Sequence, residues 1–574
     1  MKRRKPRSRR GFRCESFLLG LNLVLLPVAA RADIVADGSA PANQQPTVLN
    51  AGNGVPLVNI QTPSAAGVSR NTYSQFDVNS NGAILNNSRT DTQTQLGGWV
   101  QGNPQLATGS ARVILNEVNA NDPSRLNGYV EVAGSSAQVV IANPAGISCD
   151  GCGFINANRA TLSTGTPILN NGALEGYRVD GGQIQINGAG LNAGSAGYTD
   201  LIGQAVQVNA GVWAQRLNVV AGAGQVNADA SGIAANPSSE DVPVVAIDVS
   251  QLGGMYANSI HLVGTDAGVG VRNAGQIGAA AGEVVITADG RLENIGVVSA
   301  AQVQASANAI SNGASGELNG QQLNLQASGD FENQGAIEAQ YLKVDAGGTL
   351  NNRGLINSNT TQLRSDTLNN TGTGRIYGDT VAIGATTFNN VAQGDTAPVM
   401  AARERLDIGA QTINNQEHGL IYSSGDMAIG GSLDANNRAI GQADTLNNIS
   451  ATVQADGNLD LGIRTVNNIN AHLTTDDVQV SSEFIHEYGG EGSPNRYSPA
   501  EISFVRHDQS RDLRTPDGVY SAWYEFQYQR TVTETQVVTS DPGQILAGGN
   551  LRLNTGTVTN DNSQILAGGD LTGT

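Results

Sequence analysis

The sequence predicts an all-β chain built mainly as a right-handed parallel β-helix, a solenoid in which each coil stacks on the one before. Three observations lead to this fold class. The 574 residues include 72 glycines, with only 4% aromatic and 14% charged residues, and this glycine share is roughly double the usual ~7%. Short Val, Ile and Leu alternations are separated by Asn, Gly and Asp, which is typical of strands and turns. A repeat of about 20 residues runs through the second half, and such a period indicates a solenoid.

The first 32 residues have the pattern of a cleaved targeting segment. Eight basic residues lie within positions 2–13, an apolar run covers 17–28, and Ala30-Arg31-Ala32 supplies a small-x-small cleavage signal. The apolar run is too short to span a bilayer as a stable helix. We therefore predict a signal peptide over residues 1–32 and an exported chain that begins at Asp33.

The exported part is strongly acidic. The formal net charge is −18, and beyond the first 31 positions 23 basic and 49 acidic side chains remain. An acidic surface repels nucleic acids and anionic lipids. We therefore expect no nucleic-acid partner.

Short strands and tight turns are expected between Asp33 and about residue 270. The expected strands cover 47–49, 56–61, 74–78, 83–85, 111–118, 129–132 and 137–142. Asn103-Pro104 and Asn143-Pro144 are placed at strand boundaries, because proline has no N–H to give to a β-ladder.

Cys149 and Cys152 are the two cysteines that remain once the leader is removed, and they form a CxxC motif. A zinc site needs four ligands, and no second cysteine pair or nearby histidine is present. A redox site of the thioredoxin type expects a βαβ setting, which the pattern lacks. In an exported protein disulfides form and persist, so a structural disulfide across a tight turn is favoured over these two alternatives.

The repeat becomes clear from about Arg272 onward. Asn-x-Gly or Asn-Asn turns recur at Asn273, Asn294, Asn312, Asn333, Asn352, Asn370 and Asn390. The segment QILAGGNL at 544–551 returns as QILAGGDL at 564–571, twenty residues later. We interpret each period as one coil, with inward apolar residues stacked between coils. The asparagines should stack their amides in a ladder, and the glycines should supply corners with positive φ.

The repeat is interrupted between 475 and 540. Nine of the 25 aromatic residues of the chain fall between Phe484 and Tyr528, and within 521–530 the aromatics alternate with polar residues, as in a strand. We predict a loop and β-hairpin that leave the rod and pack on its flank. The aromatic residues Trp523, Tyr524, Phe526 and Tyr528 are a possible binding surface, because Tyr and Trp dominate interface hot spots; the alternative is that they pack the hairpin onto the rod.

No catalytic constellation is evident. The five histidines are scattered, and His486-Glu487 and His507-Asp508 are interpreted as solvated loop residues in preference to metal ligands. Glycine strings such as Gly188-Ala-Gly190 lack the strand-to-helix context of a nucleotide loop. We expect no metal, no cofactor and no enzyme activity. Coils resume over 541–574 and stop in mid-repeat without a cap, so we expect the chain to be the N-terminal part of a longer or truncated protein, with any toxin activity beyond Thr574.

Several stretches resemble the exported partner of two-partner secretion systems, the filamentous haemagglutinin family that includes CdiA-like effectors of contact-dependent inhibition. The matching stretches are VPLVNIQTPSAAGVSRNTYSQFDVNSNGAILNNS (55–88), GNPQL (102–106), IANPAGISCDGCGFINANRATLSTGTP (141–167), GGQIQINGAGLNA (181–193), VNAGVWAQRLNVVAGAGQV (208–226) and AIDVSQLGGMYANSIHLVGTDAGVGVRNAG (246–275). The QILAGGNL coils are similar to the haemagglutinin repeats of the family.

The resemblance implies two secretion motifs, NPNL and NPNGI. They stand here as Asn103-Pro104-Gln105-Leu106 and Asn143-Pro144-Ala145-Gly146-Ile147, and each departs from the family at its second Asn. The turn geometry should survive, whereas a contact through that second Asn is lost. The CxxC after the second motif is similar to the haemolysin and CdiA-like branch.

The resemblance also implies partners and a location. The family's N-terminal domain is recognised in the periplasm, after export by the Sec machinery, by an outer-membrane β-barrel of the TpsB type with POTRA domains. The chain is then secreted or held at the cell surface, where a target-cell receptor is a possible partner. The expected division is a TPS secretion (haemagglutination activity) domain over 33–270, β-helix repeats over 271–474, the aromatic segment 475–540, and repeats over 541–574.

The predicted function is therefore a two-partner secretion exoprotein whose N-terminal domain directs translocation and starts a β-helical stalk of an adhesin or a growth-inhibition effector. Two alternatives remain open at this point. One is a pore-forming haemolysin with the same secretion module. The other is a β-helical polysaccharide-acting enzyme, although such an enzyme would show an acidic and Arg/Lys-lined groove midway along the rod.

Overall fold

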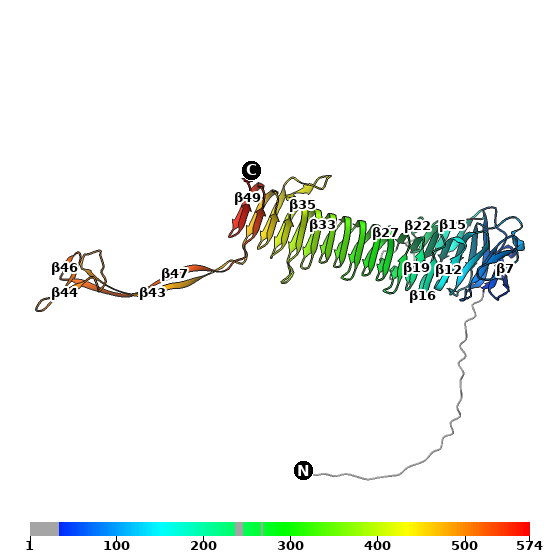
Figure 1. Cartoon of the computed structure of the whole chain (residues 1–574), viewed down its shortest axis with the longest axis horizontal. Coiled ribbons are helices and arrows are strands. Elements are labelled where there is room, and N and C mark those ends of the chain that lie inside the picture. The colour runs from blue at the N-terminus through cyan, green and yellow to red at the C-terminus, as the bar shows by residue number, and fades with distance from the viewer. Residues whose placement is uncertain (1–33, 236–244, 266–267, 574) are drawn as a thin grey trace, which may run out of the picture.

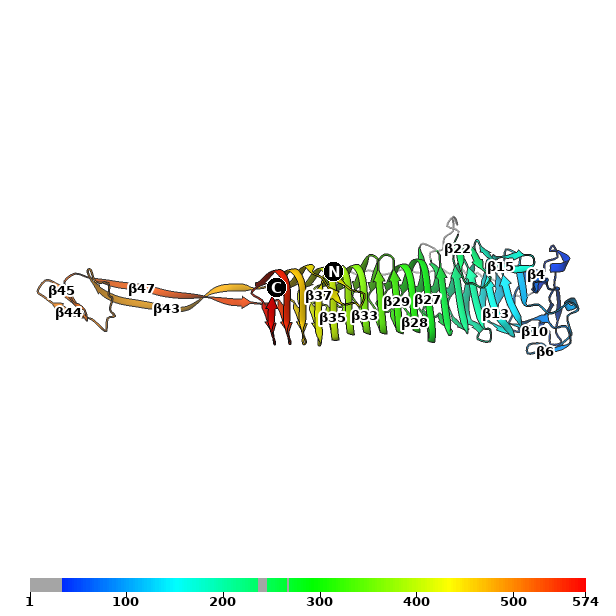
Figure 2. The same ribbon diagram turned by 90° about the horizontal axis from the view of Figure 1, so that it is seen from above.

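The chain forms a long parallel β-helix from which a hairpin projects (Figures 1 and 2). A computed structural model describes residues 34–235, 245–265 and 268–573. It joins 38 strands into one sheet system, and neighbouring coils pair in parallel, as β28 (Val297–Asn312) does with β29 (Glu317–Ala327). The predicted all-β parallel solenoid is confirmed, while the predicted signal peptide lies outside the described residues.

Antiparallel pairs begin the rod at its N-terminal end. β1 (Ile34–Ala36) pairs with β4 (Val68–Phe76), and β2 (Thr47–Asn50) pairs with β3 (Pro56–Asn59). The elements that follow are β5 (Ala83–Asn87), β6 (Thr92–Thr94), β7 (Gly98–Val100), the 3-10 helix η2 (Pro104–Leu106), β8 (Val113–Val118), β9 (Ser124–Leu126), β10 (Tyr129–Gly134), β11 (Ala137–Ala142), β12 (Ile147–Ile155), β13 (Ala157–Ser163), β16 (Gln183–Ala193), β17 (Tyr198–Gly203), β18 (Ala205–Val208), β19 (Gly211–Ala214), β20 (Arg216–Ala221), β23 (Val245–Val249), β24 (Gly254–Tyr256), β25 (Ser259–Gly264) and β26 (Val269–Asn273). Within the described ranges, no helix has the length and apolar character of a membrane span.

The middle and C-terminal coils combine long strands of up to 19 residues with strands of only three or four residues. They are β27 (Gln276–Asn294), β28, β29, β30 (Phe331–Asn333), β31 (Ala336–Ala346), β32 (Thr349–Asn352), β33 (Leu355–Thr371), β34 (Arg375–Val391), β35 (Val399–Gln416), β36 (Leu420–Ser423), β37 (Asp426–Gly430), β40 (Ala443–Ile449), β41 (Thr452–Ala455), β42 (Leu459–Ile469), β48 (Gln544–Ala547), β49 (Leu551–Asp561), β50 (Gln564–Ala567) and β51 (Leu571–Gly573), with a small antiparallel hairpin of β38 (Ser432–Leu433) and β39 (Ala439–Ile440) between them. Inward Val, Ile and Leu side chains of all these coils form one continuous core from Ile34 to Leu553. Each coil therefore buries its apolar residues against the coils before and after it.

An asparagine ladder runs along one corner of the rod, as the repeat predicts. Asn312 Nδ2 donates to Asn333 Oδ1 at 2.8 Å, and Asn333 Nδ2 donates to Asn352 Oδ1 at 2.8 Å. The same contact links Asn273, Asn294, Asn312, Asn333, Asn352, Asn370, Asn390, Asn415, Asn448, Asn468 and Asn560 in sequence order. The ladder thus continues well beyond the seven asparagines that the sequence pattern marked.

A second, half-buried asparagine ladder lies one position earlier in several of these coils. Its hydrogen bonds run in the opposite direction along the rod. Asn369 Nδ2 donates back to Asn351 Oδ1 at 2.8 Å, and Asn389 Nδ2 donates back to Asn369 Oδ1 at 2.7 Å. Asn414, Asn447 and Asn467 continue it. Each Asn-Asn pair therefore offers a neighbouring coil one donor and one acceptor, which fixes the register between coils.

The glycines beside the ladder have a different role from the predicted one. Gly335 and Gly354 are absent from the residues with positive φ in the described part of the chain. A Cβ atom on Gly335 would lie 2.1 Å from the carbonyl oxygen of Gly316, and one on Gly354 would lie 2.1 Å from that of Gly335. The prediction of positive-φ corners is wrong here, because the coils approach each other too closely at this corner for any side chain.

A four-stranded antiparallel sheet covers one side of the N-terminal coils. It consists of β14 (Thr166–Asn170), β15 (Ala173–Val179), β21 (Gly224–Asn227) and β22 (Ile233–Ala235). The buried Tyr177 of this sheet belongs to the same apolar cluster as Leu115 and Val140 of the rod. The side sheet is thus part of the folded N-terminal domain.

The interruption of the repeat forms a two-stranded ribbon that projects beyond the C-terminal coils (Figures 1 and 2). Its strands are β43 (Thr474–Gly490) and β47 (Trp523–Thr539), which pair only with each other. The predicted hairpin is confirmed, but the predicted packing on the flank of the rod is wrong. Residues 474–484 and 527–539 are exposed on both strands, because their alternating Thr, Gln, Glu and Val leave no continuous apolar face to bury.

Candidate secretion motifs and projecting tip

The first Asn-Pro turn is built around a buried asparagine side chain. Asn103 is 3% exposed and is the N-cap of η2, where its Oδ1 accepts a hydrogen bond from the Gln105 backbone N at 3.0 Å. Its Nδ2 donates to the carbonyl oxygens of Ile60 and Asn86, each at 2.9 Å. Asn103 thus closes the turn and ties it to two other segments. The sequence placed this Asn-Pro at a strand boundary, whereas Pro104 begins a 3-10 turn.

The second Asn-Pro turn repeats this construction. Asn143 is fully buried, and its Oδ1 accepts from the Ala145 backbone N at 2.9 Å. Its Nδ2 donates to the Asp122 carbonyl oxygen and to Ser124 Oγ, each at 3.0 Å. Gly146 has φ 123°, which favours glycine, and Ile147 begins β12 in the core.

The two turns share one pattern of exposure. In each, the asparagine is buried, the proline (Pro104 or Pro144) is exposed, and the third residue (Gln105 or Ala145) is half-buried. The turn hydrogen bond uses the backbone N of that third residue. Its side chain is therefore free to vary, which explains why the substitutions at the family's second Asn leave the turn geometry intact.

A cavity of about 450 Å³ borders the second turn. Its lining includes Pro144 and Ala145, Asn119 and Asn121 from the loop after β8, and Thr166 at the start of the side sheet. The exposed part of the second Asn-Pro turn, a candidate secretion motif, therefore faces a concave surface formed by three separate segments.

Cys149 and Cys152 are joined by a disulfide within β12, with their Cα atoms 5.4 Å apart. Gly151 between them has φ 75°, which the tight turn requires. Both cysteines are buried in the core of the rod. In the described part of the chain, no three His, Cys, Asp or Glu side chains come close enough to hold a metal ion.

The tip of the ribbon is a small module with its own aromatic cluster. It contains the three-stranded antiparallel sheet of β44 (Ser503–Arg506), β45 (Arg511–Thr515) and β46 (Gly518–Tyr520). The rings of Phe504 and Trp523 lie 5.1 Å apart, and Tyr488 contacts both. Arg511 covers the Phe504 ring, and Trp523 Nε1 donates to the Arg511 carbonyl oxygen at 2.9 Å. Trp523 thus holds the tip together.

The other predicted surface residues lie on one face of β47. Tyr524 is 54% exposed and Tyr528 is 41% exposed, while Phe526 between them is half-buried beneath the Arg496 guanidinium. Sequence reasoning missed Arg496 and Arg511, whose cation–π contacts depend on the folding of the tip. In the sequence, the only signal for these contacts was that Arg496 and Arg511 lie among scattered aromatic residues.

The histidines of this segment pair with carboxylates. His486 contacts Glu525 at 2.7 Å, and His507 contacts Asp512 at 3.2 Å. The hydrogen bond from His486, followed by those from Gln527 and Tyr488, lowers the pKa of Glu525. Glu525 therefore organises the ribbon where it meets the tip.

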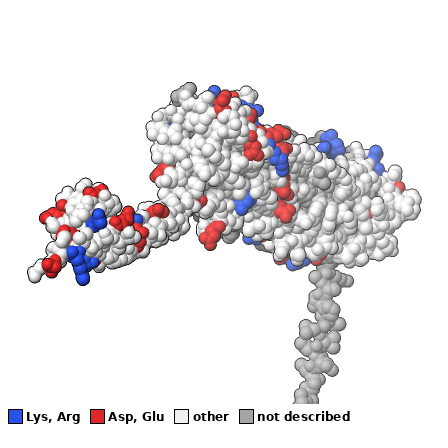
Figure 3. Space-filling view, turned by 60° about the vertical axis from the view of Figure 1, so that its left-hand side comes forward, with Lys and Arg blue, Asp and Glu red and all other residues white. Residues whose placement is uncertain are grey.

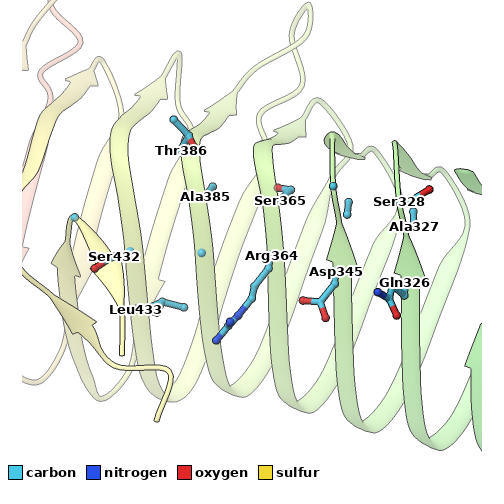
Figure 4. A pocket seen from close by; sticks show the side chains of 15 residues that line it. Gln326, Ala327, Ser328, Asp345, Arg364, Ser365, Ala385, Thr386, Ser432 and Leu433 are labelled. Carbon is cyan, nitrogen blue, oxygen red and sulfur yellow. The ribbon is translucent and has the colours of Figure 1, made fainter. Parts of the chain in front are cut away.

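A groove of about 560 Å³ lies midway along the rod (Figure 4). Gln326, Asp345 and Arg364 occupy equivalent positions in successive coils. Arg364 extends over Gly384 toward the β38–β39 hairpin, where its Nη2 donates to Asn437 Oδ1 at 2.8 Å. Asp345 is the only carboxylate in the lining, whereas glycoside hydrolysis requires two. On the face that Figure 3 shows, charges of both signs are scattered over a mostly uncharged surface.

Comparison with known proteins assigns the N-terminal part of the chain. The model of the TPS secretion domain matches residues 32–294. The chain is 60% identical over 288 residues to "Toxin CdiA" of Yersinia pestis, covering 50% of this chain and 9% of that protein. It is 49% identical over 282 residues to "tRNA nuclease CdiA-2" of Burkholderia pseudomallei (strain 1026b), covering 48% of this chain and 9% of that protein.

A solved structure, the filamentous hemagglutinin secretion domain, covers 55% of this chain and 98% of its own length, with 32% sequence identity and a TM-score of 0.39. The matched region spans only about a tenth of the length of the curated relatives, 9% of each of the two named above. The matched residues contain both Asn-Pro turns, the CxxC disulfide and the side sheet. Residues 32–294 thus match the TPS secretion domain, and this part of the chain is similar to proteins of the CdiA type.

Proposed function

We propose that residues 33–270 are the export module of this chain. After passage through the Sec machinery, an outer-membrane β-barrel of the TpsB type would bind this module in the periplasm through its POTRA domains. The observation that carries the proposal is the identical construction of the two Asn-Pro turns at Asn103 and Asn143, each with a buried asparagine and an exposed proline.

The rod suits folding outside the cell. Each coil contacts only its neighbours, so a coil can fold on the previous one as soon as it emerges. Where a coil carries an Asn-Asn pair, as at Asn369-Asn370 and Asn389-Asn390, the pair gives the emerging coil a donor and an acceptor to match. Burial of the apolar residues of each new coil then biases the chain outward, without a source of ATP.

The remaining coils, over 271–474 and 541–574, act as a stalk in this proposal, and the segment 475–540 presents a surface to a target cell. The two relatives named above carry the words toxin and nuclease in their names. We therefore favour the stalk of a contact-dependent inhibition effector, secreted or held at the cell surface, over an adhesin or a haemolysin. Cys149 and Cys152 are close enough in sequence for their disulfide to pass a narrow pore.

Export of the full chain by cells that carry a TpsB-type transporter tests the proposal that the two Asn-Pro turns serve export. In the double variant Asn103→Ala/Asn143→Ala, both turns lose their locking hydrogen bonds, and each buried partner left unsatisfied costs about 1–3 kcal/mol. We expect the amount of extracellular protein to fall at least about tenfold, measured by immunoblot of the medium.

A matched control uses two exposed turn asparagines. Asn81 and Asn127 are exposed and lie outside the lining of the cavity beside the second turn, so Asn81→Ala/Asn127→Ala should be exported like the parent. Export of the Asn103/Asn143 variant at the parental level would show that these turns do not serve export.

Binding to intact target cells tests the tip surface. Tyr524 is 54% exposed at the tip, and Trp99 is 72% exposed at the other end of the rod. Tyr524→Ala should weaken cell binding of the secreted chain about tenfold, since aromatic hot spots contribute ~2 kcal/mol or more, whereas Trp99→Ala should leave it unchanged. Flow cytometry measures both, and equal binding by the two variants would remove the tip from the proposal.

A further inference from the structure

The ribbon is a two-stranded sheet without a third strand. β43 and β47 pair with each other over their whole length, and no other strand of the described chain joins them. Isolated two-stranded hairpins are marginally stable in water, and a third strand or a packed face is normally needed. Val532 is 39% exposed, and Val537 is 62% exposed. The ribbon therefore lacks a partner.

Its two edges differ. β43 carries a bulge between Gln479 and Ser481, and near the tip Tyr488 already exchanges backbone hydrogen bonds with Tyr497. It also bears the acidic residues Asp476, Asp477, Glu483 and Glu487. Bulges and charges are the devices by which proteins protect an edge strand from pairing. The β43 edge is thus protected.

The β47 edge is less protected: its pairing irregularity, at Val538, lies at the end next to the rod, and its charges are of mixed sign. From Trp523 to Val537 its pairing skips no residue of this strand. The segment WYEFQYQRTVTETQV contains no proline or glycine and is rich in the aromatic and β-branched residues that strands favour. A long, regular, unpaired edge of this kind is a template for another strand.

We propose that β47 pairs edge to edge with β47 of a second copy of this chain, antiparallel, around a twofold axis at Val532. Residues with even numbers share one face of β47, because side chains alternate along a strand. An axis at Val532 places Arg530 opposite Glu534 of the second copy, and Glu534 opposite Arg530 of the second copy.

Charge selects this register. An axis at Arg530 would place the two arginines opposite each other, and an axis at Glu534 would do the same with the two glutamates; like charges directly opposite destabilise a sheet. Arg530 already pairs with Glu483 across the ribbon. The axis at Val532 therefore gives each arginine a carboxylate on both sides.

The assembly closes at two copies. It is a four-stranded sheet in the order β43, β47, β47, β43, whose outer edges are the bulged, acidic β43 strands. Closed twofold pairing is the commonest symmetry of oligomers. Because the ribbon projects beyond the C-terminal coils (Figures 1 and 2), the two rods lie at opposite ends of the paired sheet.

Charge reversal tests the pairing by sedimentation velocity of the full secreted chain over a concentration series. Arg530→Glu alone and Glu534→Arg alone each put like charges opposite across the axis, so each variant should dimerise at least about tenfold more weakly than the parent. An equimolar mixture of the two variants should dimerise again, because one copy then offers two glutamates and the other two arginines.

Rod variant Arg552→Glu provides the control. Arg552 is exposed and pairs with Asp460 on the rod, away from the ribbon, so this variant should dimerise like the parent. Near-ultraviolet circular dichroism of the cluster around Trp523 shows whether the tip is intact. A parent that stays monomeric, single variants that dimerise like the parent, or a mixture that stays monomeric would each overturn the proposal.

A cross-linking experiment tests the axis itself. Val532 faces its own copy, and directly opposite residues in an antiparallel pair have Cα atoms about 4.5–5.5 Å apart, which suits a disulfide. Val532→Cys should therefore form a covalent dimer under mild oxidation. Val537→Cys, which is more exposed than position 532 but lies opposite Gln527, should not. Equal cross-linking of both variants would exclude this register.

Discussion

Replacing Asp200 with Ala is expected to destabilise the N-terminal domain by about 3–5 kcal/mol, because it leaves a charged partner without compensation in a buried site. Asp200 on β17 is fully buried. Its carboxylate accepts from Arg159 Nε at 2.6 Å and Nη2 at 2.9 Å, from Thr161 Oγ1 at 2.8 Å, and from Asn218 Nδ2 at 2.8 Å. Four donor atoms from the two neighbouring coils would lose their acceptor together.

Loss of this contact should also loosen the side sheet. Arg159 Nη2 donates to the Asp229 carbonyl oxygen at 2.6 Å, and Asp229 lies in the turn between β21 and β22. Without Asp200, the guanidinium is no longer held between rod and side sheet. Amide hydrogen exchange in β13, β17, β20 and β21 measures the change coil by coil.

An exposed ion pair of the same chemistry provides the comparison. Asp460 accepts from Arg552 Nε at 3.0 Å, and both side chains are about half-exposed or more, at 49% and 65%. Surface pairs of this kind contribute about 0–1 kcal/mol, so Asp460→Ala should change local exchange little. If the Asp200→Ala and Asp460→Ala variants showed equal protection of their amides from hydrogen exchange, the hydrogen bonds of Asp200 would not stabilise the domain.

Replacing Asn333 with Leu is expected to destabilise the coils around it by about 3 kcal/mol, since each buried group left unsatisfied costs about 1–3 kcal/mol. Asn333 is fully buried. It accepts from Asn312, and its Nδ2 donates to Asn352 Oδ1 at 2.8 Å and to the Leu355 carbonyl oxygen at 3.1 Å. Leucine has a similar volume, so the effect isolates the lost hydrogen bonds.

The effect should be local, because a solenoid coil contacts only its neighbours. Hydrogen exchange should accelerate in β30 and β32 and remain parental in β13 or β49. Asn308→Leu is the matched control: Asn308 is exposed and lies outside the ladder. If the Asn333 variant exchanges like the Asn308 variant, the ladder is not a source of coil stability.

The coil repeat and the ladder were predictable because they depend on contacts between successive coils. From Asn273 to Asn390 the ladder asparagines recur about every 20 residues. This spacing corresponds to one coil, so residues at that spacing meet in the fold. The same holds for the turns at Asn103 and Asn143, whose Oδ1 atoms bond the backbone two residues later. The resemblance to secretion domains rests on these local patterns and agrees with the family match.

Other features depend on residues far apart in sequence. Arg159 and Asp200 are separated by 41 positions, and neither lies in a recognisable motif. The space requirement at Gly335 arises from the carbonyl of the previous coil, although the sequence favoured a requirement for positive φ. The hairpin was predicted to pack on the flank of the rod, yet its aromatic residues pack among themselves and beneath Arg496 and Arg511 at the tip.

The sequence by itself determined the β-solenoid, its two Asn-Pro turns and its hairpin, because periodicity and short-range turn chemistry operate between neighbouring residues and coils. Only the tertiary structure decided that the asparagines of both turns are buried while the prolines are exposed, that the side sheet is fastened through Asp200, and that β47 projects with an unpaired edge. Each of these depends on where the chain places distant segments, which no local pattern specifies.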